Sequence, residues 1–153
     1  MKKRKHRQGI FPAKSDKIPG TTEITITLDL PHRDLWPNAS KPWGAASRGR
    51  GFVVARRKKK YRRAAYATML EQGFGHLRWS RVSCTIAFYW PDRRRRDADN
   101  AQAAMKSAYD GIIDAGLVAD DDTEHLLHRP PVFAIDREHP RVEITLRRME
   151  EKV

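Results

Sequence analysis

Three stretches of the chain carry the hydrophobic pattern of β-strands. In Glu23–Leu30 every second residue is isoleucine or leucine, and Arg141–Arg148 alternates in the same way, which predicts two half-buried strands. Arg81–Trp90 is the most hydrophobic segment of the chain, with one apolar face and a second that is partly apolar, which predicts a central strand, and Pro91 marks its end. A further short strand is predicted near Glu124–His128.

Two other stretches space their apolar residues three or four positions apart, as on one face of a helix. The first is Val53–Gln72. The second runs over Ala101–Ala115 and follows Asn100 or Asp99, either of which is a suitable N-cap. Gly116 is suited to the C′ position, where a left-handed backbone commonly ends a helix.

These elements predict one domain of the α+β class, a single mixed β-sheet with two principal helices and a hairpin-like pair of strands at the C-terminus. A chain of 153 residues has a common size for one domain. We expect the domain over residues 20–150. Residues 1–19 carry seven Lys/Arg and little periodicity, so we expect a basic disordered tail there.

A long loop, Pro31–Gly51, separates the first strand from the first helix and is rich in proline, glycine, serine and arginine. Connections of this length in a compact domain are often functional. Trp36 and Trp43 lie in it among basic residues, an arrangement that can stack on unpaired bases. The alternative is that these tryptophans fix the loop to the core.

Composition indicates the kind of partner. Lysine and arginine number 31 against 19 for aspartate and glutamate, a formal net charge of +12. An excess of this size favours a polyanion, either nucleic acid or an anionic membrane surface. We expect no membrane span, because no apolar run approaches the roughly 20 residues that one needs. The single Cys84 excludes an intrachain disulfide framework and a four-cysteine zinc site, and we expect a reducing, cytoplasmic setting.

Two clusters of basic residues are candidates for contact with a DNA backbone. One follows the central strand and consists of Arg93, Arg94, Arg95 and Arg96. The other lies in the first predicted helix and consists of Arg56, Arg57, Lys58, Lys59, Lys60, Arg62 and Arg63. A run of one sign repels itself unless an anion is near, which favours DNA contact. A solvated helix face is the alternative explanation.

Carboxylates lie directly beside the first of these clusters. Asp97 and Asp99 are spaced i, i+2 where a strand gives way to a helix, so both would point to one side of an extended backbone. With a third carboxylate from Asp120–Asp122 they offer the hard oxygen ligands of Mg²⁺, an ion that promotes phosphodiester hydrolysis. An EF-hand calcium loop is excluded because Ala101 and Gln102 interrupt its pattern.

Two further interpretations of these aspartates remain open. In one they are structural, as a helix cap and an acidic turn. In the other the chain is a basic nucleic-acid-binding module without catalysis. Carboxylates repel DNA unless a metal neutralises them, so their position beside arginines favours an enzyme.

The motif RRRRDADN, followed by Lys106 and by SAYDGIIDAGLVADDD, resembles the RusA-type Holliday junction resolvases, many of which are phage-encoded. The resemblance extends more weakly upstream, to PHRDLWPNAS and YRRAAY, and covers roughly residues 20–148. It implies a RusA-like fold and Mg²⁺ as cofactor, with Mn²⁺ as a substitute. The implied ligands are Asp97, Asp99 and Asp121, with Asp120 in reserve.

The same resemblance implies that Lys106 is catalytic, although Asn100 and Lys106 are six residues apart, a longer spacing than the family's usual form. A lysine at this position would share a helix face with Asp99 and reach a phosphate. Its alternative role is an i, i+4 pair with Asp110 on a solvated surface.

Chain length also suggests a dimer. A continuous helix over Ala101–Ala115 would be about 22 Å long. The six steps from there to Asp121 span at most about 21 Å, so Asp121 would return to Asp97 only along an almost straight path. A two-fold dimer with these helices antiparallel would instead bring the two aspartates together from different chains. We therefore expect a homodimer, with active sites shared between chains as a hypothesis.

These expectations combine into a Mg²⁺-dependent, structure-selective endodeoxyribonuclease. It would resolve four-way (Holliday) junction DNA by paired symmetric nicks made by metal-activated water, in the cytoplasm of a bacterium or as a phage-encoded protein. Two alternatives are a non-catalytic basic nucleic-acid-binding protein and a metal nuclease acting on other branched or single-stranded DNA.

Overall fold

The computed structural model describes residues 20–37 and 49–150. The predicted basic tail, residues 1–19, and the part of the long loop that contains Trp43 lie outside the described residues. In chain order the elements are β1 (Glu23–Leu28), the 3₁₀ turn η1 (Arg33–Leu35), α1 (Arg50–Glu71), β2 (Val82–Trp90), α2 (Ala98–Ala104), α3 (Lys106–Asp114), β3 (Leu126–His128), β4 (Val132–Ile135) and β5 (Arg141–Arg148).

The five strands form one mixed sheet with β2 at its centre. Strand β5 lies antiparallel between β1 and β2. On the other side of β2, β3 runs parallel to its first part and β4 parallel to its last part. The predicted central strand is therefore confirmed. The predicted hairpin-like pairing of Glu124–His128 with Arg141–Arg148 is wrong, because β3 and β5 lie on opposite sides of β2, and β4 continues the edge that β3 begins.

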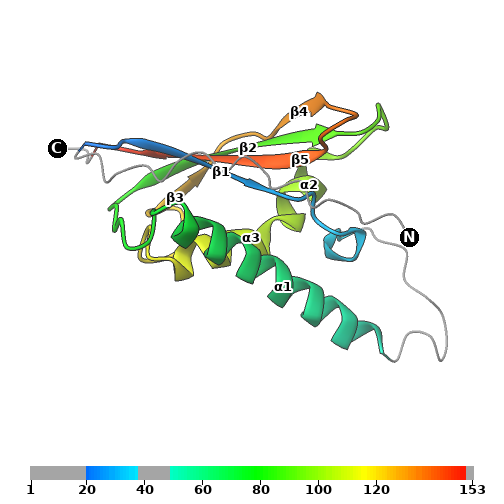
Figure 1. Cartoon of the computed structure of the whole chain (residues 1–153), viewed down its shortest axis with the longest axis horizontal. Coiled ribbons are helices and arrows are strands. Elements are labelled where there is room, and N and C mark those ends of the chain that lie inside the picture. Colours follow the sequence, from blue (N-terminus) through cyan, green and yellow to red (C-terminus); the bar gives the residue numbers. More distant parts are fainter. Residues whose placement is uncertain (1–19, 38–48, 151–153) are drawn as a thin grey trace, which may run out of the picture.

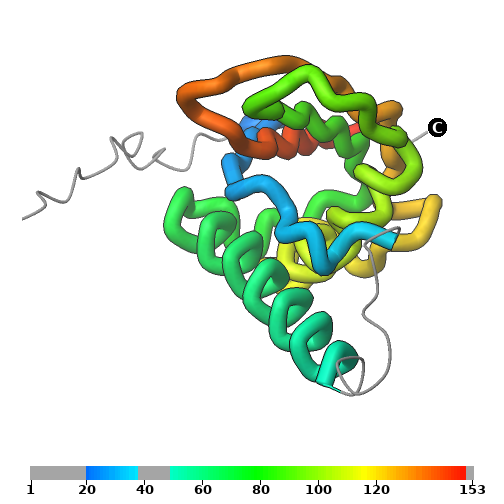
Figure 2. Tube along the Cα trace, turned by 90° about the vertical axis from the view of Figure 1, so that its right-hand side faces the viewer, coloured from blue at the N-terminus to red at the C-terminus, as the bar shows by residue number. Residues whose placement is uncertain are grey.

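The helices cover one face of this sheet, so the molecule has two layers (Figures 1 and 2). Alternation along the strands produces this arrangement. In β1, β2 and β5 every second residue is buried, and the intervening residues are half-buried or exposed. The α+β class with a mixed sheet is thus confirmed. No helix in the described part of the chain has the length and apolar character needed to cross a bilayer.

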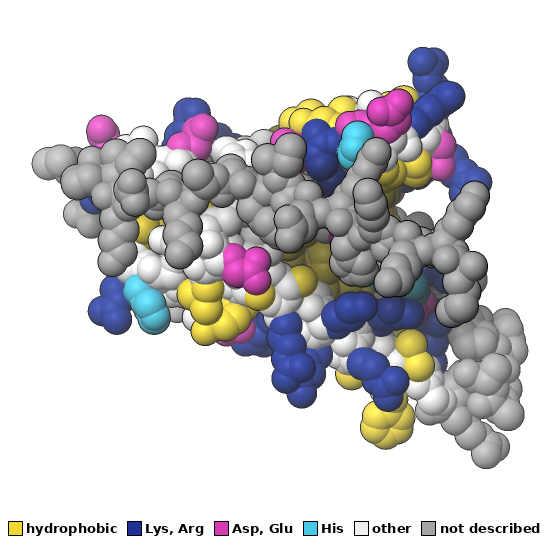
Figure 3. Space-filling model, in the orientation of Figure 1, with side chains coloured by type: hydrophobic (Ala, Val, Ile, Leu, Met, Phe, Trp, Pro, Cys, Tyr) yellow, Lys and Arg dark blue, Asp and Glu magenta, His cyan; other side chains and the backbone are white. Residues whose placement is uncertain are grey.

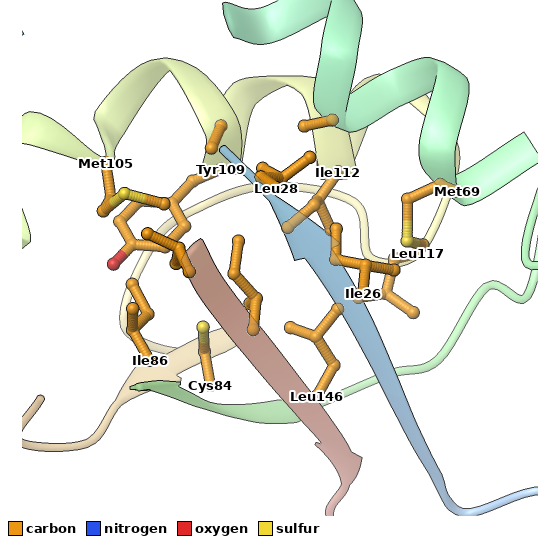
Figure 4. Close-up of a cluster of buried hydrophobic side chains, with 14 of the residues drawn as sticks. Ile26, Leu28, Met69, Cys84, Ile86, Met105, Tyr109, Ile112, Leu117 and Leu146 are labelled. Atoms are coloured by element: carbon orange, nitrogen blue, oxygen red, sulfur yellow. The ribbon is translucent and has the colours of Figure 1, made fainter. Parts of the chain in front are cut away.

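Figure 4 shows the core between the layers. Its labelled side chains come from the sheet (Ile26, Leu28, Cys84, Ile86 and Leu146), from the helices (Met69, Met105, Tyr109 and Ile112) and from Leu117 after α3. Burial raises the pKa of the Cys84 thiol to about 12, so this residue serves as a small hydrophobic side chain.

Helix α1 is much longer than the layer it joins. Its 22 residues extend about 33 Å, and its N-terminal half diverges from the sheet (Figure 1). The buried residues Tyr61, Ala65 and Met69 all lie in its C-terminal half. That half packs closely on α3 at Gly111, where a Cβ atom would lie 2.2 Å from the Arg62 carbonyl oxygen. The basic N-terminal half is therefore a protruding arm.

The second predicted helix is divided at Met105 into α2 and α3, so the prediction of one continuous helix is wrong. The Met105 N–H donates to the carbonyl of Gln102 at 3.1 Å, an i→i−3 bond that tightens the chain into a 3₁₀-type turn. The Met105 side chain is buried, with its sulfur 3.5 Å from the Tyr61 hydroxyl. Packing against α1 thus accompanies the break.

The predicted C-terminal end of this helical segment is confirmed, and the predicted N-cap is wrong. Gly116 has φ +83° directly after the C-cap Ala115, which confirms its C′ role. The N-cap is Asp97, so the prediction of Asn100 or Asp99 is wrong by two or three positions. Asp97 takes the role because its backbone is still extended while its carboxylate reaches the first turn.

Candidate active site

Asp97 lies where the segment after β2 enters α2. Its backbone has φ −83° and ψ 130°, and its Oδ1 accepts the N–H of Asn100 at 2.9 Å. This contact satisfies one of the backbone donors that a helix start leaves free. One carboxylate oxygen is thereby occupied, and the exposed side chain presents the other to solvent.

Asp99 follows in the first turn of α2, where it is exposed and forms no ion pair with a described residue. Within residues 20–37 and 49–150, no three Asp, Glu, His or Cys side chains lie close enough together to hold a metal ion. The carboxylates predicted as ligands, Asp97, Asp99, Asp120 and Asp121, are therefore not gathered into one cluster. Their role as metal ligands stays a prediction.

Lys106 opens α3 and contacts both the predicted site residue Asp121 and Asp110, its partner in the alternative interpretation. Its ammonium forms ion pairs with Asp121 and, at 3.3 Å, with Asp110. The hydrogen bond with Asp121 is the main cause that raises the pKa of Lys106, and the same bond lowers the pKa of Asp121. Both groups are therefore charged near neutral pH. The Lys106 side chain is 63% exposed, so an anion can approach its ammonium from solvent.

The backbone after α3 is what brings Asp121 back to Lys106. The N–H groups of the segment after α1 donate to this backbone: His76 to Ala115, Arg78 to Gly116 and Trp79 to Leu117, at 2.8, 2.9 and 2.7 Å. Leu117 and Val118 are then buried in the core. The chain is thus held against the body of the protein as it turns, and Asp121 arrives beside the first residue of α3.

This return replaces the straight path assumed in the shared-site hypothesis, while the approach of Asp121 to Asp97 stays a prediction. That hypothesis assumed a straight helix of about 22 Å before Asp121. Helix α3 has only nine residues, about 14 Å, and Asp121 reaches Lys106 within the same chain. A second chain is therefore not required to bring Asp121 to the lysine.

The four arginines after β2 are not equivalent. Arg96 donates to Asp92 at 2.8 Å, and Arg94 lies 3.6 Å from the same carboxylate. Arg93 and Arg95 are exposed and form no ion pair with any residue of the described ranges. Arg93 and Arg95 are thus the better candidates for phosphate contact, whereas Arg96 stabilises the turn.

Trp36 gives the long loop a structural anchor. Its indole N–H donates to the Pro31 carbonyl at 3.4 Å, and its ring lies 5.7 Å from that of Trp90. The Arg96 guanidinium lies 3.9 Å from the Trp90 ring centroid, within cation–π range. For Trp36 the core-anchoring alternative is therefore the correct one. Trp43 lies outside the described residues.

Two of the predicted DNA-binding residues of α1 are engaged within the fold. Arg62 donates to both oxygens of Asp114 on α3, at 2.5 and 2.7 Å. Arg57 lies 3.9 Å from the carboxylate of the buried Asp34. Arg50 lies closer to the same carboxylate, at 2.7 Å, although the two groups are not aligned for a hydrogen bond. The exposed members without an ion pair to a described residue are Arg56, Lys58, Lys59, Lys60 and Arg63. Basic side chains gather over α1 in Figure 3.

A groove lies between this basic helix and Lys106. It has a volume of about 830 Å³ and lies between α1 and the junction of α2 with α3. Lys58, Lys59 and Arg62 line one side, and Lys106 and Asp110 line the other. An anion in the groove would therefore meet cations from both helices.

Sequence reasoning missed one group of polar side chains next to this site. The Nε2 atom of Gln102 lies 3.0 Å from Nδ1 of His128, the last residue of β3, and the ring of Tyr109 lies 4.5 Å from the imidazole. Gln102 and His128 are 26 positions apart. No rule of sequence spacing connects the two residues. The one signal in the sequence was Gln102, a polar residue among the alanines of α2.

Comparison with known proteins gives the family. No protein-family model matches the chain. The crossover junction endodeoxyribonuclease RusA of Escherichia coli (strain K12) is 35% identical over 101 residues, which are 63% of this chain and 74% of that protein. The protein of the same name from Shigella sonnei (strain Ss046) is 34% identical over a stretch of the same length. The resemblance seen in the DADN motif is thereby confirmed, and the chain belongs to the RusA family.

Proposed function

We propose that the protein is an endodeoxyribonuclease that cleaves four-way junction DNA. The observation that carries the proposal is the Lys106–Asp121 ion pair, whose lysine lies on the wall of a basic groove, in a chain related to crossover junction endodeoxyribonucleases. The protruding half of α1 supplies sequence-independent attraction for the phosphate backbone. Lys106 contacts the phosphate at the reacting position, where its positive charge stabilises developing negative charge.

We also propose Mg²⁺ as cofactor, with Mn²⁺ as a substitute. Asp97, Asp99 and Asp121 would hold it, with Asp120 in reserve. The chemistry of this set supports the assignment, because carboxylate oxygens are the ligands that Mg²⁺ takes and these side chains are exposed or half-exposed. When bound, the ion supplies a water of lowered pKa and neutralises phosphate charge. The Lys106 ion pair keeps Asp121 ionised, the form that binds a cation.

A homodimer is the assembly that we propose for this activity. A four-way junction is symmetric, and its resolution needs two nicks in strands of like polarity. Two active sites related by a two-fold axis match that requirement. Light scattering after size exclusion tests the assembly directly, and a monomeric mass with and without junction DNA would contradict it.

Cleavage of defined DNA tests the activity. Purified protein is incubated with a synthetic four-way junction in Mg²⁺, in Mn²⁺ and in EDTA, and a linear duplex of the same sequence serves as the substrate control. We expect paired nicks in the junction only, in either metal, and none in EDTA. An Asp121→Asn protein prepared in parallel controls for contaminating nuclease.

The other outcomes identify the alternatives. Binding of the junction without cleavage in either metal would favour a non-catalytic nucleic-acid-binding protein. The separation of the carboxylates in the described residues would agree with that alternative. Equal cleavage of flaps, forks or single strands would favour a metal nuclease of other specificity. Cleavage undiminished in EDTA would overturn the metal proposal alone.

A further inference from the structure

We propose that His128 is an additional substrate-contacting residue, which donates its Nε2–H to a phosphate oxygen held at Lys106. The proposal rests on the proposed nuclease function and deepens it. Nothing in the DADN motif or its spacing indicates this residue, because His128 belongs to β3 and enters the site from the sheet.

The position of His128 is fixed by two neighbours from the divided helix. Gln102 of α2 approaches its Nδ1 at 3.0 Å, and Tyr109 of α3 packs against its ring with centroids 4.5 Å apart. Gln102 precedes Lys106 by four residues and Tyr109 follows it by three. The two groups that hold the imidazole therefore come from the turns on either side of Lys106.

The carboxamide of Gln102 lies in a largely buried setting beside Tyr109 and His128. The Gln102 Oε1 and the Tyr109 hydroxyl are both buried without an aligned hydrogen-bond partner. Burial raises the pKa of Tyr109, and the Gln102 carboxamide opposes that rise.

The contact with Gln102 determines the tautomer. The Gln102 NH₂ group faces Nδ1 of His128, so Nδ1 must accept and Nε2 must carry the hydrogen. The imidazole then offers a fixed N–H donor on the side opposite Gln102. Burial lowers the pKa of His128, with opposing effects from Asp121 and Lys106, so the ring is neutral near pH 7.5 and lies within electrostatic reach of both.

A neutral donor suits this place. A phosphate oxygen beside Lys106 is already drawn to a positive charge, and a neighbouring N–H adds direction without altering the charge of the site. Because the hydrogen bond strengthens as the oxygen gains negative charge, it stabilises the transition state more than the bound substrate. No proton is transferred in this role.

Two substitutions separate this role from a structural one. In His128→Asn the amide oxygen can stand in for Nδ1 and keep the Gln102 contact, but the outward donor is lost. In His128→Gln the longer side chain places an N–H near the Nε2 position. We expect His128→Asn to lower the single-turnover cleavage rate at saturating junction roughly 10- to 100-fold. We expect His128→Gln to retain most of the rate, with junction affinity and melting temperature near wild type in both.

The control is His139→Asn, which replaces an exposed histidine in the turn between β4 and β5 and should leave the rate unchanged. A purely structural role would reverse the order, with His128→Asn faster than His128→Gln. That order, or wild-type rates in both variants, would overturn the proposal.

A second measurement does not depend on cleavage. Long-range ¹H–¹⁵N correlation spectra of the labelled protein at pH 7.5 should show His128 as the Nε2–H tautomer. The spectra of Gln102→Glu should show the Nδ1–H tautomer, because a carboxylate accepts that hydrogen. An Nδ1–H tautomer in the wild type overturns the inference about His128. Failure of the wild type to cut the junction would instead overturn the proposed function.

Discussion

Lys106 and Asp121 are 15 positions apart, and their side chains form an ion pair that ties the first residue of α3 to the turn before β3. The adjacent carboxylate, Asp122, is engaged differently and lies 2.7 Å from Nδ1 of His125. Two neighbouring aspartates thus have separate partners. This separation makes them a matched pair for experiment.

Lys106→Ala and Asp121→Asn should each lower the single-turnover rate of junction cleavage by about 100-fold or more, because each removes a charge at the proposed reacting phosphate. Asp122→Asn should stay near wild type, since asparagine still accepts the backbone N–H groups of Glu124 and His125. Gel analysis of nicked products gives the rates. Equal losses in Asp121→Asn and Asp122→Asn would contradict the assignment.

Asp97 should show two separable functions. Asn is a good N-cap, so Asp97→Asn should retain the melting temperature while junction cleavage in Mg²⁺ is lost. Asp97→Ala should lose cleavage and in addition about 1 kcal/mol of unfolding free energy, because the Asn100 N–H loses its acceptor. Urea denaturation measures the stability. If Asp97→Asn cleaves normally, Asp97 is a cap and not a metal ligand.

Adjacent arginines should differ in the same way. Arg95→Ala should weaken junction binding and reduce the slope of log K against log salt by about one, as expected for one lost phosphate contact. Arg96→Ala should instead lower the unfolding free energy by ~1 kcal/mol, because its guanidinium is stacked on Trp90 and bonded to Asp92. Binding titrations across a salt series, with thermal melts, distinguish the two. A large loss of stability in Arg95→Ala would disprove this division.

The contact between α1 and α3 should depend on pH through Asp114. The hydrogen bond from Arg62 lowers the pKa of Asp114, so the folded state favours the carboxylate. Its stabilisation is therefore present above the ordinary aspartate pKa of about 3.9 and lost as pH falls through the lower folded value. We expect Asp114→Asn to be less stable than wild type in urea at neutral pH, and the difference to shrink in strong acid. A difference that grows on acidification would show the opposite linkage.

The sheet and α1 could be predicted because their signals are local. Alternation in Glu23–Leu30 and Arg141–Arg148 identifies the buried face of each strand without knowledge of its partner. The break at Met105 could not be predicted, since it accompanies packing on Tyr61, 44 positions away. Strand β4 was missed because it is short and largely exposed, and its role at the edge depends on β2.

In the candidate site, too, some residues could be identified from the sequence and others depend on contacts between distant parts of the chain. The resemblance to the RusA family singled out Lys106 and Asp121, and the structure brings them together. Spacing did not reveal that Asp97 caps α2 or that Arg96 stacks on an aromatic ring, because both depend on what lies nearby in three dimensions. His128 was missed for the same reason, since it joins the site only through the path of β3.

The break at Met105 also separates the contacts that fix the two parts of the motif. Helix α2 is fixed at its start by Asp97, and Lys106 is held from the other side by Asp110 and Asp121. The orientation of Lys106 therefore depends on α3 and on the turn before β3, and not on an unbroken helix that starts near Asn100. The turn at Met105 thus acts as a joint between two independently anchored segments.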